Sequence, residues 1–243
     1  MTNILKYAID TYKKNIYLIS IFSISFIIAF LILLFATLPT YSDAGGIFLR
    51  MQSLFLNMNW FNTSIIVVAV LLSLLFLSFA IVAINVIVKH SRTSTKITKE
   101  VINGLEQYTT KVFIVLLLFT LIFGLIEFTN YMFNISSLLS SLLIIVLTPF
   151  FFYTPSSIVI DDLRIVRAIN MSVRFFIKRV DYFLLWLIIA VVLVSVFDFI
   201  FIVTTGTFLS RYLMFIFNSL FILPFLVVLQ SQSYMNRFSL LKR

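Results

Sequence analysis

Residues 64–88 read SIIVVAVLLSLLFLSFAIVAINVIV, a run of 25 positions without one acidic or basic side chain. The hydrocarbon core of a bilayer is about 30 Å thick, and a helix needs about 20 apolar residues to cross it. This stretch is therefore long enough to span a membrane as a single helix. It shows little contrast between apolar and polar positions, which predicts that several of its faces meet lipid or other helices alike.

Five further stretches of the chain meet the same criterion of length and composition. They cover residues 16–38, 112–133, 135–153, 182–205 and 212–229. The sequence thus predicts an all-α fold, an integral membrane bundle of six transmembrane helices that forms one polytopic domain over residues 1–243. Residues 131–137 alone separate the third span from the fourth, and Asn130 and Asn134 supply turn chemistry for a tight hairpin there.

The composition of the whole chain indicates the same class of protein. Of 243 residues, 62% are apolar and 11% are charged, whereas soluble globular proteins are roughly half apolar and one quarter charged. Phenylalanine occurs 29 times and cysteine does not occur. These values disfavour a soluble enzyme, a disordered chain and a disulfide framework.

Lysine and arginine predict the orientation of the chain, because cytoplasmic loops hold an excess of these residues. All 18 of them except Arg50 and Arg211 fall in the N-terminal segment, near residues 89–111, near residues 164–179, or in the C-terminal tail. We therefore expect a multi-pass protein of the cell membrane with both termini in the cytoplasm. The first apolar run of 23 residues exceeds the core of a signal peptide and is expected to be retained as a span.

A short pattern recurs before the first, third and fifth spans. A small residue is followed four positions later by a residue with a hydroxyl group, so the two share one helix face. The pairs are Ala8 and Tyr12, Gly104 and Tyr108, and Ala168 and Ser172. We interpret the chain as three repeats, at about 1–88, 96–153 and 161–232, each a cytoplasmic interfacial amphipathic helix followed by a two-span hairpin.

The third interfacial helix is expected to begin at Asp161 and Asp162, where acidic groups favour the positive end of the helix dipole. Its apolar positions recur at three- and four-residue steps, as in a helix that lies in the headgroup layer. A cytoplasmic basic face is predicted here and in the second loop, from Lys96, Lys99, Arg164, Arg167, Arg174 and Lys178. One interpretation is anchoring on anionic lipid, and the other is docking of an acidic partner or nucleic acid.

The segments 150–155 (FFFYTP), 160–162 (IDD) and 167–174 (RAINMSVR) resemble a known pattern, in which a span ends near a proline and an acidic turn precedes a basic helix. The pattern is that of the six-span YciC-like family, which includes archaeal members, and of the membrane domain attached to some glycerophosphodiester phosphodiesterases. The opening 12–15 (YKKN) and the outer loop 38–50 are similar to the same family. In size and number of spans, the chain also resembles the polytopic subunit of the crenarchaeal DNA-import system. These resemblances imply a fold and a location, and no catalytic residues.

Two carboxylates fall inside predicted spans, Glu127 in the third and Asp198 in the fifth. A carboxylate in hydrocarbon is costly and usually faces a bundle interior or water. Counted from the cytoplasmic side at about 1.5 Å per residue, both lie at similar depth toward the outer surface. One interpretation is a proton or cation site with Arg211 or Arg50 nearby. The other is a pair of interface residues that reach water or pair with arginine.

Two prolines predict kinks, because each removes a helical hydrogen bond. Pro149 lies in the fourth span and Pro224 in the sixth. The outer loop at 39–63 is long and apolar, and we expect in it a short helix that lies flat on the membrane or re-enters it. Asn62 and Asn134 begin glycan-acceptor patterns on the predicted outer side.

No set of residues in the sequence predicts catalysis, a metal site or a cofactor. His90 is the single histidine, and we find no phosphate-binding loop and no nucleophile with a base. The first functional hypothesis is therefore a non-enzymatic subunit of a transport or translocation assembly, with DNA import as its specific form. Its expected partners are the lipid bilayer, further copies or small membrane subunits, and nucleic acid or a cytoplasmic ATPase.

The alternative hypothesis is a structural or lipid-organising membrane protein without a pore. The two hypotheses differ in what they require of the polar residues inside the spans. A pore requires these residues to converge on one lumen, whereas a lipid-organising protein does not. The residues concerned are Ser73, Ser78, Asn85, Thr148 and Asn218.

Overall fold

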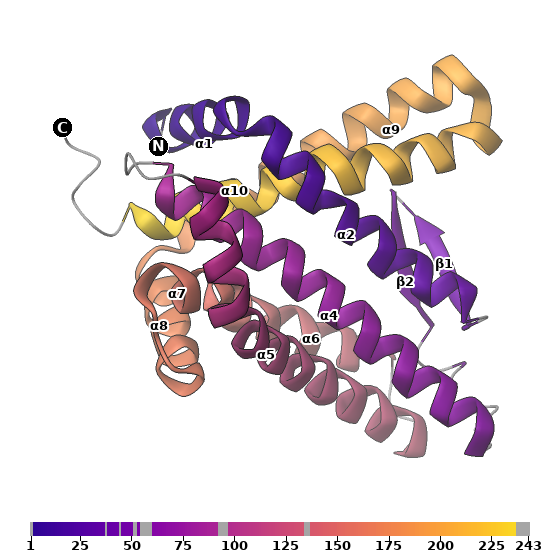
Figure 1. Ribbon diagram of the computed structural model, residues 1–243. Coiled ribbons are helices and arrows are strands. Elements are labelled where there is room, and N and C mark those ends of the chain that lie inside the picture. Colours follow the sequence, from indigo (N-terminus) through magenta and orange to yellow (C-terminus); the bar gives the residue numbers. More distant parts are fainter. Residues whose placement is uncertain are drawn as a thin grey trace.

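The computed structural model describes residues 2–36, 38–43, 45–50, 53, 60–91, 97–133 and 137–236. Its regular elements are helices and one β-hairpin (Figure 1). In chain order they are α1 (Thr2–Lys14), α2 (Ile16–Phe35), β1 (Thr40–Asp43), β2 (Gly46–Leu49), α4 (Trp60–His90), α5 (Ile97–Phe133), α6 (Ser137–Phe152), α7 (Thr154–Asp161), α8 (Ile165–Lys178), α9 (Val180–Phe217), the π-helical turn η1 (Asn218–Ile222) and α10 (Leu223–Met235).

Five helical segments are long and apolar enough to cross a membrane among the residues that the structure describes. They are Ile16–Phe35, Trp60–His90, Lys99–Phe133, Leu138–Asp161 and Val180–Met235. The last is 56 residues long, or about 84 Å if it were straight, far more than a bilayer core requires. It reverses direction instead at Gly206, whose φ of 76° is a left-handed value open to glycine. Figure 1 shows the two limbs of α9 folded back on each other.

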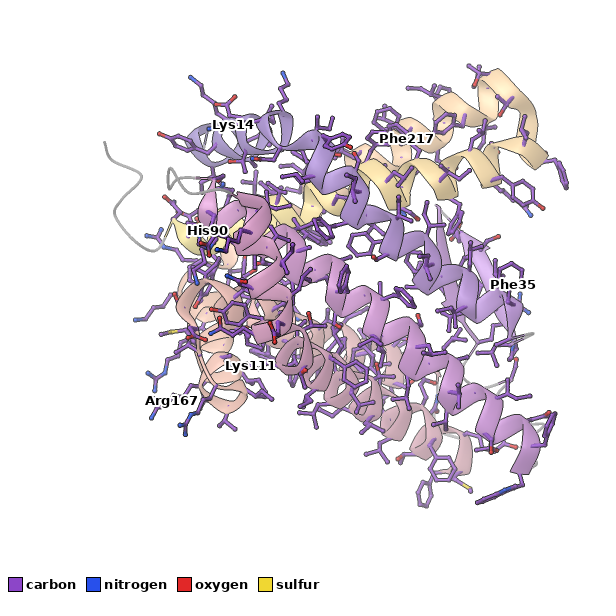
Figure 2. The ribbon with its side chains drawn as sticks, viewed as in Figure 1. Lys14, Phe35, His90, Lys111, Arg167 and Phe217 are labelled. Carbon is purple, nitrogen blue, oxygen red and sulfur yellow. The ribbon has the colours of Figure 1, made fainter. Side chains whose placement is uncertain are left out.

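The helices meet at one end of the molecule and spread apart toward the other (Figure 1). Helices α1, α7, α8 and the end of α10 lie at the closed end, whereas the β-hairpin and the reversal in α9 lie at the open end. Lys14, His90, Lys111 and Arg167 are all found toward the closed end, and Phe35 is found at the opposite end (Figure 2). The basic side chains of four different elements are thus brought to one side.

The main core lies at the closed end and is built from three helical runs that are buried on all sides. These runs are 82–88 in α4, 153–159 across the start of α7, and 228–234 in α10, seven residues each. Helices α4, α7 and α10 pack against one another in pairs. A helix is buried all round only when other helices cover every face, so these runs form the centre of the bundle.

The second interfacial helix and the outer loop differ from the expectations drawn from the sequence. The second expected interfacial helix, at 103–111, is not a separate element, because it is continuous with the span that follows it in α5. In the outer loop, the expected helix is wrong for residues 46–49, which form strand β2 and pair antiparallel with β1. The glycines explain the hairpin, since Gly45 adopts a φ of 73° in its turn. Helix α4 begins at Trp60, and Asn62 is exposed within it, whereas Asn134 lies outside the described residues.

Candidate functional site

Side-chain hydrogen bonds join the buried run of α10 to that of α4 and to residues on either side of the buried run 153–159. Ser231 in α10 donates to Oδ1 of Asn85 in α4 at 2.7 Å, and Gln230 donates to the carbonyl of Phe152, beside α7. Tyr234 donates from its hydroxyl to Asp161 at 2.6 Å. Buried polar groups are costly unless they are bonded, so these contacts fix α10 against its two neighbours in one register.

Helix α1 is held against the same core. Gln232 in α10 donates to the hydroxyl of Thr11 at 2.9 Å, and Tyr12 donates to the carbonyl of Phe221 at 3.4 Å. Burial raises the pKa of Tyr12 to about 12, so its hydroxyl stays protonated and remains a donor at physiological pH. These bonds tie the amino-terminal helix to residues more than 200 positions away in sequence.

The small residues of the recurring pattern all lie in close packing contacts. Ala8 and Ala168 are fully buried, as is Ser172. Gly104 lies so close to α4 that a Cβ atom at this position would be 2.6 Å from Cγ2 of Val86. Glycine therefore permits the close approach of α5 to the buried run of α4.

Ser172 in α8 bridges the break between α6 and α7. Its hydroxyl donates to the carbonyl of Phe150 at 2.7 Å and accepts from the backbone N–H of Tyr153 at 3.0 Å. The predicted kink residue Pro149 is buried in α6 just before this break. Helix α7 then starts with Pro155 in its first turn, a favoured position for proline because the N–H group is not needed there.

Asp161 and Asp162 do not begin the third interfacial helix, as the sequence had predicted. They end α7, and α8 starts later, at Ile165. Carboxylates are unfavourable at a helix C-terminus, and here cations compensate for them. Nζ of Lys111 lies 3.2 Å from Oδ1 of Asp162. Lys89 donates to the carbonyl of Val159 at 2.7 Å, in the last turn of α7.

The basic residues predicted as a docking face are exposed wherever the structure describes their side chains. They are Lys99, Arg164, Arg167, Arg174 and Lys178, whereas Lys96 lies outside the described residues. The apolar side chains of α8 lie on both its outer and its inner side. Val166 is 71% exposed, and the side chains that pack inward are Ala168, Ser172 and Phe175. Helix α8 therefore presents basic and apolar side chains together on its outer surface.

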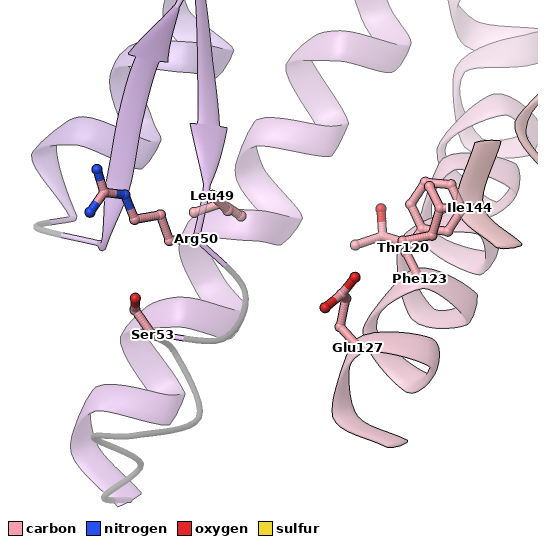
Figure 3. Close-up of a pocket in the computed structure, with 7 residues that line it drawn as sticks. All are labelled: Leu49, Arg50, Ser53, Thr120, Phe123, Glu127 and Ile144. Atoms are coloured by element: carbon pink, nitrogen blue, oxygen red, sulfur yellow. The ribbon is translucent and has the colours of Figure 1, made fainter. Parts of the chain in front are cut away.

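Glu127 lines a pocket of about 490 Å³ toward the open end. The pocket lies between α5, Ile144 of α6, the last residue of strand β2 (Leu49), and residues 50 and 53 that follow this strand. Figure 3 shows the Glu127 carboxylate directed toward the hairpin side, while the guanidinium of Arg50 points away from it. The guanidinium lies instead 5.7 Å from the ring centroid of Tyr41. Glu127 and Arg50 thus share a pocket without pairing within it.

Asp198 lines a larger cavity of about 860 Å³ between α2, the β-hairpin and the two limbs of α9. Arg211 and Asp43 line the same cavity. The reversal at Gly206 brings the two α9 residues together, since Asp198 precedes it by eight positions and Arg211 follows it by five. This cavity combines three charged side chains with a wall that is mostly apolar.

The second predicted kink residue, Pro224, lies directly after the π-helical turn η1. In this turn the N–H of Leu223 reaches the carbonyl of Asn218. The same turn places the side chain of Asn218 against the hairpin, where its Nδ2 donates to the carbonyl of Gly45 at 2.8 Å. Irregular helical turns of this kind often occur at functional positions, and here the turn positions the wall of the larger cavity.

Four of the five polar residues singled out inside the spans make hydrogen bonds in separate parts of the molecule. Ser78 donates to the carbonyl of Leu75, and Thr148 donates to that of Ile144, each within its own helix. Asn85 belongs to the closed-end core, whereas Asn218 contacts the hairpin. These bonds hold the polar side chains within their own helices or between packed elements.

The sequence interpretation missed the polar run Gln230-Ser231-Gln232-Ser233, although the run is visible as an interruption at the end of an apolar span. It also missed Asp43, because nothing local in the sequence links the outer loop to Asp198. Within the described part of the chain, no group of three or more His, Asp and Glu side chains is placed to hold a metal ion.

Comparison with known proteins gives no relative for this chain. No protein-family model matches the sequence, no curated protein matches it, and no solved structure matches the fold. The features that characterise the chain are therefore its own: a composition typical of polytopic membrane proteins, a core at the closed end that includes buried polar residues, and two pockets with charged residues toward the open end.

Proposed function

We propose that the chain crosses the cell membrane six times and keeps both termini in the cytoplasm. Five long apolar helical segments support a multi-pass protein, and the reversal at Gly206 supports two crossings for the last of them. The gathering of Lys14, His90, Lys111 and Arg167 at the closed end (Figure 2) supports a cytoplasmic position for that end. In this orientation α1 and α8 lie at the inner headgroup layer.

We further propose that the protein is non-enzymatic and organises lipid-like molecules in the outer leaflet. The observation that carries this proposal is the contrast between the two ends of the bundle. The closed end is tightly packed and includes the bonded pair Asn85 and Ser231, whereas the open end holds pockets that combine apolar walls with Glu127 or Asp198. Many wall residues of the larger pocket face outward, including Phe208 at 77% and Tyr212 at 58% exposure. Such a pocket is accessible from the surrounding lipid.

A second candidate function is a subunit of a transport or translocation assembly, with DNA import as its specific form. It is favoured by the small buried share of one apolar stretch of 18 residues in each of two segments, 11% within Lys99–Phe133 and 0% within Val180–Met235. These faces are available for further copies of the chain or for small membrane subunits. The exposed Arg167, Arg174 and Lys178 are suited to nucleic acid or to an acidic face of a cytoplasmic ATPase.

Purification from native membranes in a mild detergent separates the two candidates. The mass of the particle and the identity of every co-purifying chain and lipid would be recorded by native mass spectrometry. A particle that contains this chain and bound lipid alone supports the lipid-organising function. A defined complex with other membrane subunits or an ATPase contradicts it and supports the translocation assembly.

A further inference from the structure

The larger cavity has the features of a built binding site rather than of a gap between helices. Its volume of about 860 Å³ falls within the usual range for ligand pockets. Three separate parts of the chain form it: α2, the β-hairpin and both limbs of α9. A site of this size is large enough for a headgroup together with part of a hydrocarbon chain.

The hairpin that covers the cavity is held firmly in place. Nδ2 of Asn218, the buried first residue of η1, donates a hydrogen bond to the carbonyl of Gly45. A Cβ atom at Gly45 would lie 2.8 Å from the backbone oxygen of Met214, so the turn of the hairpin is in direct contact with the second limb. Asp43 lies at the end of β1, and Arg211 lies in the second limb of α9. Packing of the hairpin turn against this limb therefore holds the two residues in fixed positions relative to each other.

The three charged side chains that line the cavity, all described by the structure, do not form ion pairs with one another. Among the described residues, no ion pair within 4 Å joins Arg211 to Asp198 or to Asp43. Charged groups near a bilayer are costly and usually have a partner. Two carboxylates and one guanidinium that line one cavity without pairing are complementary to a ligand that carries a cation and an anion together.

The rest of the wall is complementary to hydrocarbon. It is formed by Ile27, Leu31 and Leu34 of α2 and by Ile202, Phe215 and Ile216 of α9. These side chains continue from the charged region toward the lipid-exposed surface, where Leu34 and Ile216 are 44% and 46% exposed. The ligand that satisfies both regions is an amphiphile with an acyl or prenyl chain.

We propose that this cavity binds a phospholipid whose headgroup contains a phosphate and a primary ammonium group. Arg211 binds the phosphate, for which its guanidinium offers paired donors. Asp198 and Asp43 accept hydrogen bonds from the ammonium, and the lipid chain lies between α2 and α9. A quaternary ammonium has no N–H to donate, so the site distinguishes ethanolamine from choline. This inference rests on the proposed lipid-organising function and specifies its ligand.

The test uses the full chain reconstituted in bilayer discs of equal parts phosphatidylethanolamine, phosphatidylcholine and phosphatidylglycerol. Lipids that remain bound after release into the gas phase are counted by native mass spectrometry. For the unaltered protein we expect an enrichment of phosphatidylethanolamine over both other lipids. Loss of a charge-assisted hydrogen bond should reduce this enrichment about tenfold in Asp198→Asn. Glu106→Gln, at an exposed position that lines neither pocket, is the matched control and should keep the enrichment.

Arg211→Gln is a second variant, at an exposed position that should not affect folding. It should weaken retention of all three phospholipids, because each of them carries a phosphate. Retention without headgroup preference, equal in the unaltered protein and in Asp198→Asn, would overturn the proposed ligand and leave the lipid-organising function standing. An unaltered protein that retains no lipid at all would overturn both.

Discussion

The contact between Gly104 and Val86 gives a prediction whose sign depends on one neighbouring side chain. Replacing Gly104 with alanine places a Cβ 2.6 Å from Cγ2 and 3.2 Å from Cγ1 of Val86. Overpacking of this kind costs about 1–3 kcal/mol, whereas alanine in place of glycine gains about 1 kcal/mol of helix propensity. We expect Gly104→Ala to lower the free energy of unfolding by about 1 kcal/mol.

The same change in a Val86→Ala background should have the opposite effect. Only Cβ of residue 86 would then remain near the new methyl group, at an ordinary contact distance of 3.4 Å. The helix-propensity gain should dominate, and Gly104→Ala should stabilise by about 1 kcal/mol. Unfolding of the four proteins in mixed micelles with increasing sodium dodecyl sulfate measures all of these values.

Asn103→Ala is the control, because it changes an exposed position one residue away on the same helix. Asn103→Ala should change the free energy of unfolding by a similar amount in the unaltered protein and in the Val86→Ala background. If Gly104→Ala changed the free energy of unfolding by the same amount in the unaltered protein and in the Val86→Ala background, the close approach of α4 and α5 would be refuted.

Two further substitutions test the closed-end core by the same unfolding measurement. Ser231→Ala removes the donor to Asn85 and should destabilise by about 1–3 kcal/mol, because a buried amide oxygen loses its partner. The control is Ser64→Ala, because the hydroxyl of Ser64 bonds a carbonyl of its own helix at the surface; it should change the free energy of unfolding by less than about 0.5 kcal/mol. Equal effects of the two substitutions would contradict the role of the Ser231–Asn85 bond in the closed-end core. Lys89→Met removes the charged donor in α4 that bonds the carbonyl of Val159, in the last turn of α7. This change should lower the free energy of unfolding by about 1.5–3 kcal/mol. The exposed Lys99→Met should have little effect, and a comparable loss there would show that the bond to Val159 is unimportant.

The apolar helices were predictable because hydrocarbon thickness sets a minimum length that few soluble sequences meet. Residues 64–88 lie entirely within α4, and the helix extends beyond them only by a few polar and aromatic positions at each end. The sequence predicted two separate helices at 182–205 and 212–229, whereas the structure has one continuous segment over Val180–Met235 that reverses at Gly206. Gly206 stands among Thr204, Thr205 and Thr207, and its positive φ is not visible from composition.

The placement of Asp161 and Asp162 was wrong for a reason that the sequence contains. Thr154-Pro155 is a typical helix start, and it identifies 154–161 as a helix of its own that ends in the two carboxylates. The bonds that stabilise this arrangement come from Lys89 and Lys111, many residues away. A local dipole argument therefore assigned the acids to the wrong helix.

The candidate pockets were only partly foreseeable. Glu127 and Asp198 stand out in any reading of the spans, and the arginines named beside them, Arg50 and Arg211, line the same pockets. The hairpin was missed because the apolar residues after Gly46 also suit an interfacial helix. Its position depends on Asn218, 173 residues from Gly45, and no local pattern reports such a contact.

The absence of cysteine from the sequence allows the most direct test of the proposed topology. Single cysteines at the exposed positions Ser42, Arg174 and Thr205 would be labelled in intact cells with a maleimide that does not cross membranes. We predict that Ser42→Cys and Thr205→Cys react from outside, whereas Arg174→Cys reacts only after the membrane is permeabilised. Reaction of Arg174→Cys in intact cells, or protection of Thr205→Cys until permeabilisation, would contradict six crossings with a cytoplasmic closed end.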